Sequence, residues 1–253
     1  MILSANAKNE FKVAFVFPAY NAEQTLERTL SEIPEGTADF LILVDDASSD
    51  STAELARKLG MTVVVHSRNL GYGANQKTCY SEALSTDADC IIMLHPDNQY
   101  DARVSIAMID LIRIGVCDVI LGNRIRTRSE ALNGGMPRWK YLINRTSTFF
   151  ENLFLGQSIG DFHSGFRAYS REALEVVPFL ENSDDFAFDQ EFLMQAIFFN
   201  FKIGDVPVPV RYMKEASSIS FKRSVQYGLG AVNAFLAMKM TKWNLRTDSR
   251  FKL

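Results

Sequence analysis

Short apolar runs alternate with amphipathic segments through the first half of the chain. Five runs rich in Val, Ile, Leu and Phe are each about as long as a buried parallel strand, and they cover residues 11–17, 40–44, 61–65, 90–94 and 116–121. Helical spacing of apolar residues marks the segments between them, residues 23–33, 51–59, 72–84 and 103–114. This order predicts an α/β fold, with a mostly parallel sheet flanked by helices. Because ligands bind beyond the carboxyl ends of such strands, we expect the site in the loops after the strands.

The second half is less regular. Residues 124–135 are polar and contain two adjacent glycines, which predicts a mobile loop. Residues 137–155 and 191–199 are expected to be helical, and residues 202–212, with two prolines, suit an edge strand. Apolar residues at three- or four-residue spacing predict a last amphipathic helix over residues 225–243.

Charge is distributed unevenly along the chain. The net charge is −3, but residues 214–253 contain eight basic and two acidic residues, which leaves −9 for residues 1–213. The overall balance excludes a globally basic nucleic-acid-binding protein. The basic end suits either an anionic partner such as a membrane face or a solvated helix face. We expect one domain over residues 1–221 and a basic amphipathic helix and tail over residues 222–253.

Cysteine usage favours a reducing compartment. Cys79, Cys90 and Cys117 are an odd number without CxxC spacing, so we expect core thiols, with no disulfide or zinc site. The start of the chain has no signal-peptide pattern, and no uncharged apolar run reaches the ~18 residues that a membrane span needs. These features predict a cytoplasmic protein, with any contact at the inner face of the cell membrane being peripheral.

Polar residues follow the first two predicted strands. Tyr20 and Glu23 come after the first, where a tyrosine ring can lie against a base or ribose and the acid can cap a helix or bind a ligand. Asp45 and Asp46 end the second, where a nucleotide would bind and where acids accept hydrogen bonds from a base edge or from ribose hydroxyls. Residues 50–51 are the expected caps of the next helix.

A third cluster follows the fourth predicted strand. Asp97 and Gln99 offer a carboxylate and an amide oxygen two residues apart, a pair that can bind a hard cation such as Mg2+ or Mn2+ and so neutralise a diphosphate. A polar turn between strand and helix, with an aspartate as cap, explains the same residues equally well.

Several motifs occur in a characteristic order. They are Pro18-x-Tyr20-Asn21-x-Glu23, Val44-Asp45-Asp46-x-Ser48-x-Asp50-x-Thr52, Asp97-x-Gln99, Gly122-x-Arg124, Ser164-Gly165-Phe166-Arg167 and Phe188-x-x-Glu191. Together they resemble the family 2 glycosyltransferases of GT-A fold, in particular the polyprenyl-phosphate (dolichol-phosphate) mannosyl- and glucosyltransferases. The resemblance covers residues 11–220, with a nucleotide-sugar half over residues 11–123 and an acceptor half over residues 124–221.

The resemblance implies an inverting transfer of a hexose from a nucleotide diphosphate sugar to a polyprenyl phosphate. The expected nucleotide-sugar contacts are Pro18, Tyr20, Glu23, Val44, Asp45, Asp46 and Asp97. The expected cation ligands for Mg2+ or Mn2+ are His95, Asp97 and Gln99. The expected acceptor contacts are Arg124, Lys140, Ser164 and Arg167. Because a lipid phosphate is already ionised at pH 7, catalysis then rests on positioning and charge neutralisation, with Asp97 and Arg124 as the leading residues.

Two departures from the family pattern bear on the donor. His95 stands where the family has the first acid of a D-x-D-x-Q segment, which removes a charge and suits Mn2+ better than Mg2+. An arginine and a lysine that the family directs at the diphosphate fall on Met213 and Ile219.

Two other functions are compatible with the residues. If the acceptor were a sugar hydroxyl of a polysaccharide or glycolipid, a general base would be needed, and Asp189 and Glu191 are the candidates. An acid-rich first helical turn explains these two residues equally well. The departures at the diphosphate also allow a non-catalytic nucleotide-sugar-binding protein.

Overall fold

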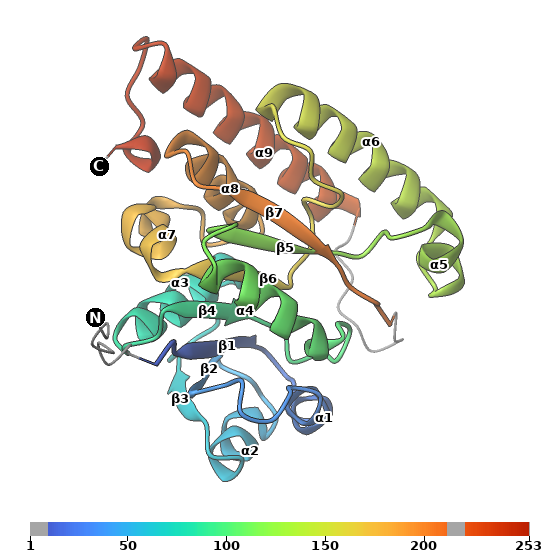
Figure 1. Cartoon of the computed structure of the whole chain (residues 1–253), viewed down its shortest axis with the longest axis vertical. Helices are drawn as coiled ribbons and strands as arrows, with labels where there is room; N and C mark the ends of the chain where they lie inside the picture. Colours follow the sequence, from blue (N-terminus) through green and yellow to red (C-terminus); the bar gives the residue numbers. More distant parts are fainter. Residues whose placement is uncertain (1–9, 212–220, 253) are drawn as a thin grey trace, which may run out of the picture.

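A seven-stranded sheet forms the centre of the protein (Figure 1). The computed structural model describes residues 10–211 and 221–252. The strands are β1 (Val13–Ala19), β2 (Phe40–Asp45), β3 (Thr62–Val65), β4 (Cys90–Met93), β5 (Val119–Asn123), β6 (Arg167–Ser170) and β7 (Ile203–Pro207). Their order is β3-β2-β1-β4-β6-β5-β7, and all neighbours are parallel except at β6, which is antiparallel to β4 and β5. The predicted α/β fold with a mostly parallel sheet is confirmed.

Helices cover both faces of the sheet. They are α1 (Leu26–Ser31), α2 (Thr52–Lys58), α3 (Tyr72–Leu84), α4 (Ser105–Arg113), α5 (Arg128–Asn133), α6 (Arg138–Leu155), α7 (Arg171–Val176), α8 (Phe188–Phe198) and α9 (Phe221–Lys242). Successive strand side chains point to opposite faces, so Ala14 and Val16 of β1 pack with α3, α7, α8 and α9. Phe15 and Phe17 of the same strand pack with α1, α2 and α4.

The topology gathers the loops of interest at one edge. β1, β2, β4 and β5 are parallel, so the loops that follow them leave the sheet at the same side, called here the carboxyl edge. Because β6 runs in the opposite direction, residues 161–166 in front of it reach the same edge. Neither β6 nor α7 is predicted by the sequence, and the antiparallel strand is what brings residues 161–166 to the site.

Two sequence predictions need correction. Residues 124–135 are not simply a loop, since residues 128–133 form α5, and the Thr127 side chain caps it by accepting a hydrogen bond from the Glu130 N–H. Ser51 holds the N-cap position of α2 without a side-chain hydrogen bond, whereas Asp50 Oδ1 accepts one from the Thr52 N–H at 3.0 Å. The prediction that residues 202–212 include an edge strand is confirmed by β7.

The C-terminal helix belongs to the same core. Ala234 and Met238 of α9 are buried with α3 and α8 side chains. Met213 and Ile219, where the family has basic residues, lie outside the described residues. Cys79 and Cys90 are buried and Cys117 is partly buried, all as free thiols. Over residues 10–211 and 221–252, the helices are too short or too polar to cross a bilayer.

Candidate functional site

The loop after β1 carries Tyr20 out to solvent. Pro18 is buried in β1 beside Val44 of β2, and the Tyr20 side chain directly after the strand is 56% exposed. Glu23 Oε2 accepts a hydrogen bond from the Ser51 N–H at 3.1 Å, which ties this loop to the start of α2. An exposed ring at the carboxyl edge can stack on a flat ligand such as a nucleobase.

The two acids after β2 are buried. Asp46 Oδ1 accepts hydrogen bonds from His66 Nδ1 at 2.7 Å and from the Leu70 N–H at 2.8 Å, while Oδ2 accepts one from the Gly71 N–H at 3.0 Å. The Asp46 carboxylate therefore holds the loop between β3 and α3 at the carboxyl edge. Since a carboxylate accepts about four hydrogen bonds, it can still accept one from a ligand. Asp45 is equally buried beside it.

The residues after β4 contact partners within the protein. The Gln99 N–H donates to Asp97 Oδ1 at 3.1 Å, and Gln99 Nε2 donates to Oδ2 at 2.8 Å. His95 Nε2 lies 3.2 Å from the Tyr72 hydroxyl. Among the described residues, no three His, Cys, Asp or Glu side chains are grouped closely enough to hold a metal ion. One carboxylate and one imidazole at the same strand end fit a divalent cation only in part.

Asp189 lies at the start of α8 and is almost fully engaged. Its Oδ2 accepts a hydrogen bond from the Tyr72 hydroxyl at 2.9 Å, and Oδ1 accepts one from Gln76 Nε2 at 3.1 Å. The Arg167 guanidinium is 3.7 Å from Oδ1. Because both oxygens of this carboxylate already accept hydrogen bonds within the protein, the geometry leaves little capacity to accept one from an acceptor hydroxyl.

Both carboxylate oxygens of Glu191, a candidate base in the sequence, have partners within the protein. Its Oε1 accepts a hydrogen bond from Arg250 Nη1 at 2.7 Å, and Oε2 accepts one from the Ser183 N–H at 2.5 Å. The side chain is 9% exposed. Glu191 therefore anchors the C-terminal turn of the chain to α8.

The side chain of Arg167, an expected acceptor contact, is completely buried. The guanidinium donates to the carbonyl oxygens of Ser164, Phe162 and Asp189. Ser164 is also fully buried, and its hydroxyl oxygen accepts the Phe166 N–H. Both residues therefore shape residues 161–166 and leave no surface for contact with an acceptor in this structure.

Arg124 forms the basic part of the site together with Lys140. Arg124 Nε and Nη2 donate to the two carboxylate oxygens of Asp161 at 2.6 and 3.1 Å, and Asn144 of α6 also donates to this carboxylate at 2.9 Å. Burial would raise the pKa of Asp161, but the Arg124 charge and hydrogen bonds outweigh it, so the pKa is held below its usual range. Burial and the Arg124 charge lower the pKa of Lys140. Arg124 and Lys140 thus place two cations close to one another at this end of α6, an arrangement that suits an anion.

Glu151, a largely buried acid on the inner side of α6, belongs to none of the sequence motifs. Glu151 Oε2 lies 3.3 Å from His163 Nε2 and has no hydrogen-bond partner among the described residues. Burial, with the negative charge of Asp161, raises the pKa of Glu151 to about 8. Burial also lowers the pKa of His163 to about 4. At neutral pH the pair is therefore largely an uncharged acid beside an uncharged imidazole.

The amphipathic pattern of α6 is inverted. Its inner side is polar, with Asn144 hydrogen-bonded to Asp161 and Thr148 buried. Its outer side, called here the α6 apolar face, consists of large side chains that are each about half or more exposed, namely Trp139, Leu142, Ile143, Phe149, Phe150, Leu153 and Phe154. Contiguous exposed apolar residues of this kind mark an interaction surface.

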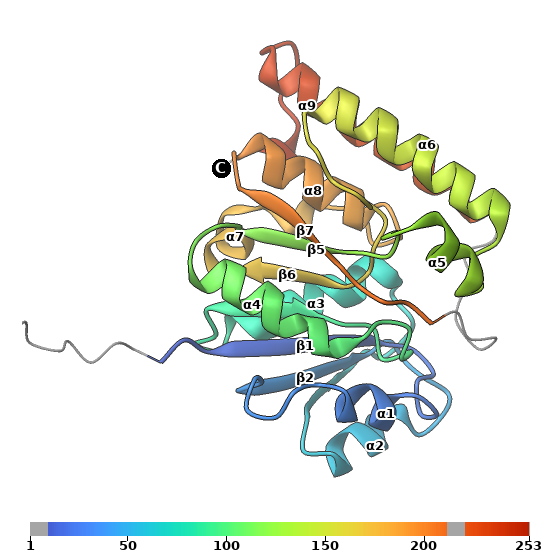
Figure 2. The same cartoon turned by 45° about the vertical axis from the view of Figure 1, so that its right-hand side comes forward.

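Helix α9 extends this surface. α6 and α9 lie side by side in both views (Figures 1 and 2), and the Phe154 and Phe235 rings are 5.7 Å apart. The exposed apolar residues of α9 and the segment after it are Val232, Leu236, Met240, Trp243 and Leu245. Lys242 and Arg246 are exposed among them.

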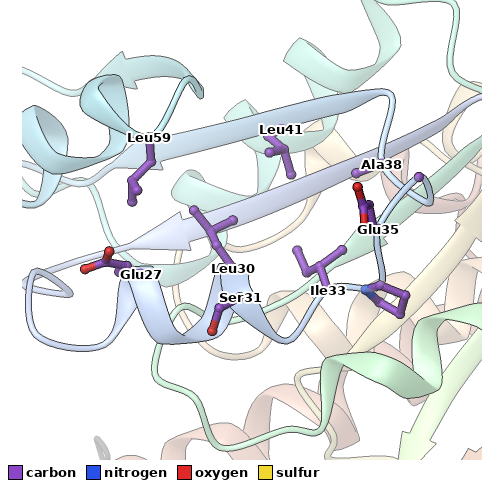
Figure 3. Close-up of a pocket in the computed structure, with 10 residues that line it drawn as sticks. Glu27, Leu30, Ser31, Ile33, Glu35, Ala38, Leu41 and Leu59 are labelled. Carbon is purple, nitrogen blue, oxygen red and sulfur yellow. The ribbon is translucent and has the colours of Figure 1, made fainter.

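One concave pocket lies away from the carboxyl edge. It has a volume of about 400 Å³, and its lining includes Leu30 of α1, Leu41 of β2, and residues 33–36 and 38 between them (Figure 3). These residues lie at the amino end of β2, opposite the loops described above. None of the predicted site residues lines this pocket.

Residues 14–177 match the model of the family described as "Glycosyl transferase family 2". The chain belongs to this family. Its relatives include a dolichyl-phosphate hexose transferase of Haloferax volcanii, 29% identical over 79% of this chain and 82% of the relative. A UDP-N-acetylglucosamine–dolichyl-phosphate N-acetylglucosaminyltransferase of Methanococcus voltae is 25% identical over 91% of this chain and 97% of the relative. These relatives support the polyprenyl-phosphate branch of family 2.

Solved structures confirm the GT-A fold. Glucosyl-3-phosphoglycerate synthase from Mycobacterium tuberculosis, in complex with phosphoglyceric acid, superposes with a TM-score of 0.67 at 20% identity, covering 90% of this chain and 80% of that one. The same synthase with Mn2+, uridine diphosphate and glucosyl-3-phosphoglycerate gives a TM-score of 0.64 at 19% identity, covering 94% and 82%. That synthase binds Mn2+ together with uridine diphosphate.

Proposed function

We propose that this family 2 glycosyltransferase moves a hexose from a nucleotide diphosphate sugar to a polyprenyl phosphate at a membrane surface. The observation that carries the proposal is the α6 apolar face, which begins one residue from Lys140, and α6 also supplies Asn144 to the Arg124–Asp161 pair. A single helix thus combines an outward apolar surface with an inward polar site. This combination suits an acceptor whose phosphate enters the site while its prenyl chain stays in lipid.

The occupant of the α6 apolar face is best explained as a lipid bilayer. Helices that lie in a membrane interface carry large apolar residues on one side and basic residues beside them. Here the aromatic rings of Trp139, Phe149 and Trp243 are half or more exposed, and Lys242 and Arg246 lie next to Trp243. Each apolar side chain that enters the bilayer contributes about 1.5–3 kcal/mol when fully buried, and the basic side chains attract anionic lipids.

The acceptor phosphate is assigned to Arg124 and Lys140. A phosphate oxygen attacks the anomeric carbon of the donor sugar as the bond from that carbon to the diphosphate breaks, and the bonding electrons leave with the nucleoside diphosphate. No proton has to be removed, because the phosphate is ionised at neutral pH. The two cations hold the phosphate in line and offset its charge as it approaches the donor.

The donor is assigned to the loops after β1, β2 and β4. Tyr20 is placed to stack on the base, and Asp46 can accept one further hydrogen bond from the nucleoside. A divalent cation held by Asp97 and His95 would supply positive charge for the leaving diphosphate. The Mn2+ of the synthase structures supports a cation of this kind.

The geometry favours a phosphate over a sugar hydroxyl as acceptor. A hydroxyl requires a base, and both oxygens of Asp189 already accept hydrogen bonds while Glu191 is paired with Arg250. Replacing Asp189 by Asn cannot separate the two acceptors, however, because the change also disturbs Tyr72 and Arg167.

The acceptor is therefore tested directly. The full chain is incubated with radiolabelled nucleotide sugars, Mn2+ and a polyprenyl phosphate in vesicles, and we expect label in the organic phase as an acid-labile lipid. Parallel reactions contain the dephosphorylated polyprenol or soluble saccharides. Label in saccharide alone, or equal transfer to polyprenol, contradicts a phosphate acceptor, and nucleotide binding without transfer to any acceptor contradicts catalysis.

A further inference from the structure

His66 joins the ends of two strands to helix α3. It follows β3 directly, and its N–H donates to the carbonyl oxygen of Asp45 at 2.9 Å. Its side chain is 8% exposed. Nδ1 lies 2.7 Å from Asp46 Oδ1, and Nε2 lies 2.9 Å from the hydroxyl oxygen of Thr78 on α3. Both ring nitrogens therefore have a polar partner, which holds the imidazole in one orientation.

These contacts assign a proton to Nδ1. A carboxylate oxygen accepts hydrogen bonds, so the nitrogen beside Asp46 must donate. This holds in both protonation states of the ring, because the Thr78 hydroxyl can either donate to Nε2 or accept from it. His66 therefore presents a fixed donor to Asp46, and Thr78 supports the ring from its other side.

The Asp46 carboxylate has one position left for a ligand. Each carboxylate oxygen accepts about two hydrogen bonds. Oδ1 already accepts two, from His66 and from a backbone N–H of the loop before α3, whereas Oδ2 accepts one, from a second backbone N–H of that loop. The Asp46 N–H donates to the carbonyl oxygen of Ala19 at 2.9 Å, so the acid lies beside the start of the loop that carries Tyr20. A base on the Tyr20 ring has beside it a carboxylate with room for a single donor.

The common bases differ in what their pairing edge offers to one acceptor. Uracil and thymine have a single N–H there. Guanine has two adjacent donors, which pair with both oxygens of a free carboxylate. Adenine and cytosine place a ring nitrogen lone pair beside their amino group, and this lone pair is repelled by a carboxylate. One free position on Oδ2 therefore matches the edge of uracil or thymine.

We propose that His66 is a specificity-determining residue for the donor nucleotide, because it occupies Oδ1 of Asp46 and leaves Oδ2 to a pyrimidine with a single N–H. Thr78 is a positioning residue that acts through His66. The inference deepens the proposed function, on which it rests in taking Asp46 as the contact for the base. It names the donor as a sugar diphosphate of uridine or thymidine.

The first test uses the full chain without variants. Calorimetry measures the Kd for the diphosphates of uridine, thymidine, guanosine, cytidine and adenosine at one Mn2+ concentration. We expect uridine or thymidine diphosphate to bind most tightly, and the tighter of the two identifies the pentose. N3-methyluridine diphosphate lacks the N–H and should bind about tenfold or more weakly than uridine diphosphate. Equal Kd values for these two, or tightest binding of guanosine diphosphate, overturn the inference alone. Binding of no nucleotide overturns the proposed function as well.

The role of His66 is tested by base discrimination, the Kd for guanosine diphosphate divided by that for uridine diphosphate. His66→Leu frees Oδ1 of Asp46, so we expect this ratio to fall about tenfold or more. In His66→Asn the amide nitrogen can replace Nδ1 as donor, and we expect a ratio near that of the wild type. General damage to the fold would weaken both nucleotides alike. An unchanged ratio in His66→Leu, or an equal fall in both variants, overturns the role.

Thr78 has a matched control on the same helix. Thr78 Oγ1 and Ser81 Oγ lie 3.2 and 2.8 Å from the carbonyl oxygen one turn earlier, and of the two only Thr78 also contacts His66. Thr78→Val removes the hydroxyl at nearly constant size and frees the ring to turn, so we expect base discrimination to fall. Ser81→Ala should keep the wild-type ratio. Equal ratios in the two variants overturn the supporting role of Thr78.

Discussion

Arg250 Nη1 lies 2.7 Å from Glu191 Oε1, and this ion pair ties the short C-terminal turn η3 (Ser249–Phe251) to α8. The two side chains are 12% and 9% exposed. Phe251 packs against Phe198 of α8 beside the pair, with ring centroids 5.2 Å apart. Glu191 therefore stabilises the packing of the C-terminal turn on α8. Asp189, only two residues earlier, faces the site instead.

Replacing Glu191 by Gln should lower stability and leave turnover unchanged. The change removes the ionic partner of a buried arginine, and hydrogen bonds to charged groups contribute about 1.5–3 kcal/mol. Urea denaturation should show a loss of this size in Glu191→Gln and in Arg250→Gln, with a double variant that loses less than the sum. Loss of turnover in Glu191→Gln at full folding would restore the residue as a catalytic base.

Glu151 makes stability depend on pH. Its pKa in the folded protein is about 8, above the 4.5 of an unperturbed glutamate in an unfolded chain. Between these values the unfolded chain releases the proton and the folded protein keeps it, so the free energy of unfolding should fall as pH rises from about 5 to 8. Glu151→Gln should remove this contribution. The difference in free energy of unfolding between variant and wild type should therefore shift by about 2–4 kcal/mol in favour of the variant from pH 5 to pH 8.

The measurement for Glu151 is urea denaturation at pH 5, 6.5 and 8. His163, Asp161 and Arg167 are the charged or titratable groups that act on this carboxyl, so their own titration must be common to both proteins. Glu27→Gln on the exposed side of α1 serves as control and should follow the wild-type curve. Parallel curves for wild type and Glu151→Gln would contradict a raised pKa.

The α6 apolar face should bind vesicles. Leu142 and Leu153 are 66% and 63% exposed, and in Leu142→Ser/Leu153→Ser we expect at least a tenfold loss of binding to anionic vesicles, since each leucine contributes about 1.5–3 kcal/mol when buried in lipid. Ile114 at the end of α4 and Leu180 between α7 and α8 are 68% and 62% exposed, so Ile114→Ser/Leu180→Ser is a matched control. Sedimentation with vesicles measures the effect, and equal loss in both double variants would argue against a specific lipid-binding face.

Lys140 should affect the acceptor and not the donor. In Lys140→Gln we expect the KM for polyprenyl phosphate to rise about tenfold or more, because a charge-assisted contact to phosphate is lost, while the Kd for uridine diphosphate stays unchanged. Arg138, two residues earlier and exposed, provides the control Arg138→Gln. Steady-state kinetics and calorimetry give the two constants. An increased Kd for the nucleotide with an unchanged acceptor KM would assign Lys140 to the donor instead.

Much of the fold follows from local sequence patterns. The strand and helix alternation over residues 11–121 predicts β1 to β5 and α1 to α4, because periodicity and strand length are local properties. β6 escapes prediction, since its four residues Arg167–Ser170 begin with a charged side chain and have no apolar run. Only its pairing between β4 and β5 makes it a buried strand.

The sequence predicts those site residues that come directly after predicted parallel strands. The motifs of residues 18–23, 44–52 and 95–99 all reach the carboxyl edge, as parallel strands require. Contacts between distant residues are not encoded in such patterns. Arg167 could bind a phosphate or fill the core, and only its three backbone carbonyl partners decide for the core.

The sequence by itself determined the α/β architecture, the order of its chemistry-bearing loops and the glycosyltransferase family. Tertiary structure alone decided which side of α6 faces water, which acid of the Asp189–Glu191 pair faces the site, and that Tyr72 joins His95 to Asp189. The physical reason is that helical periodicity shows that a helix has two unlike faces but not what packs against each. That choice depends on residues far away in the chain, such as Asp161 beneath α6 and Arg250 beside α8.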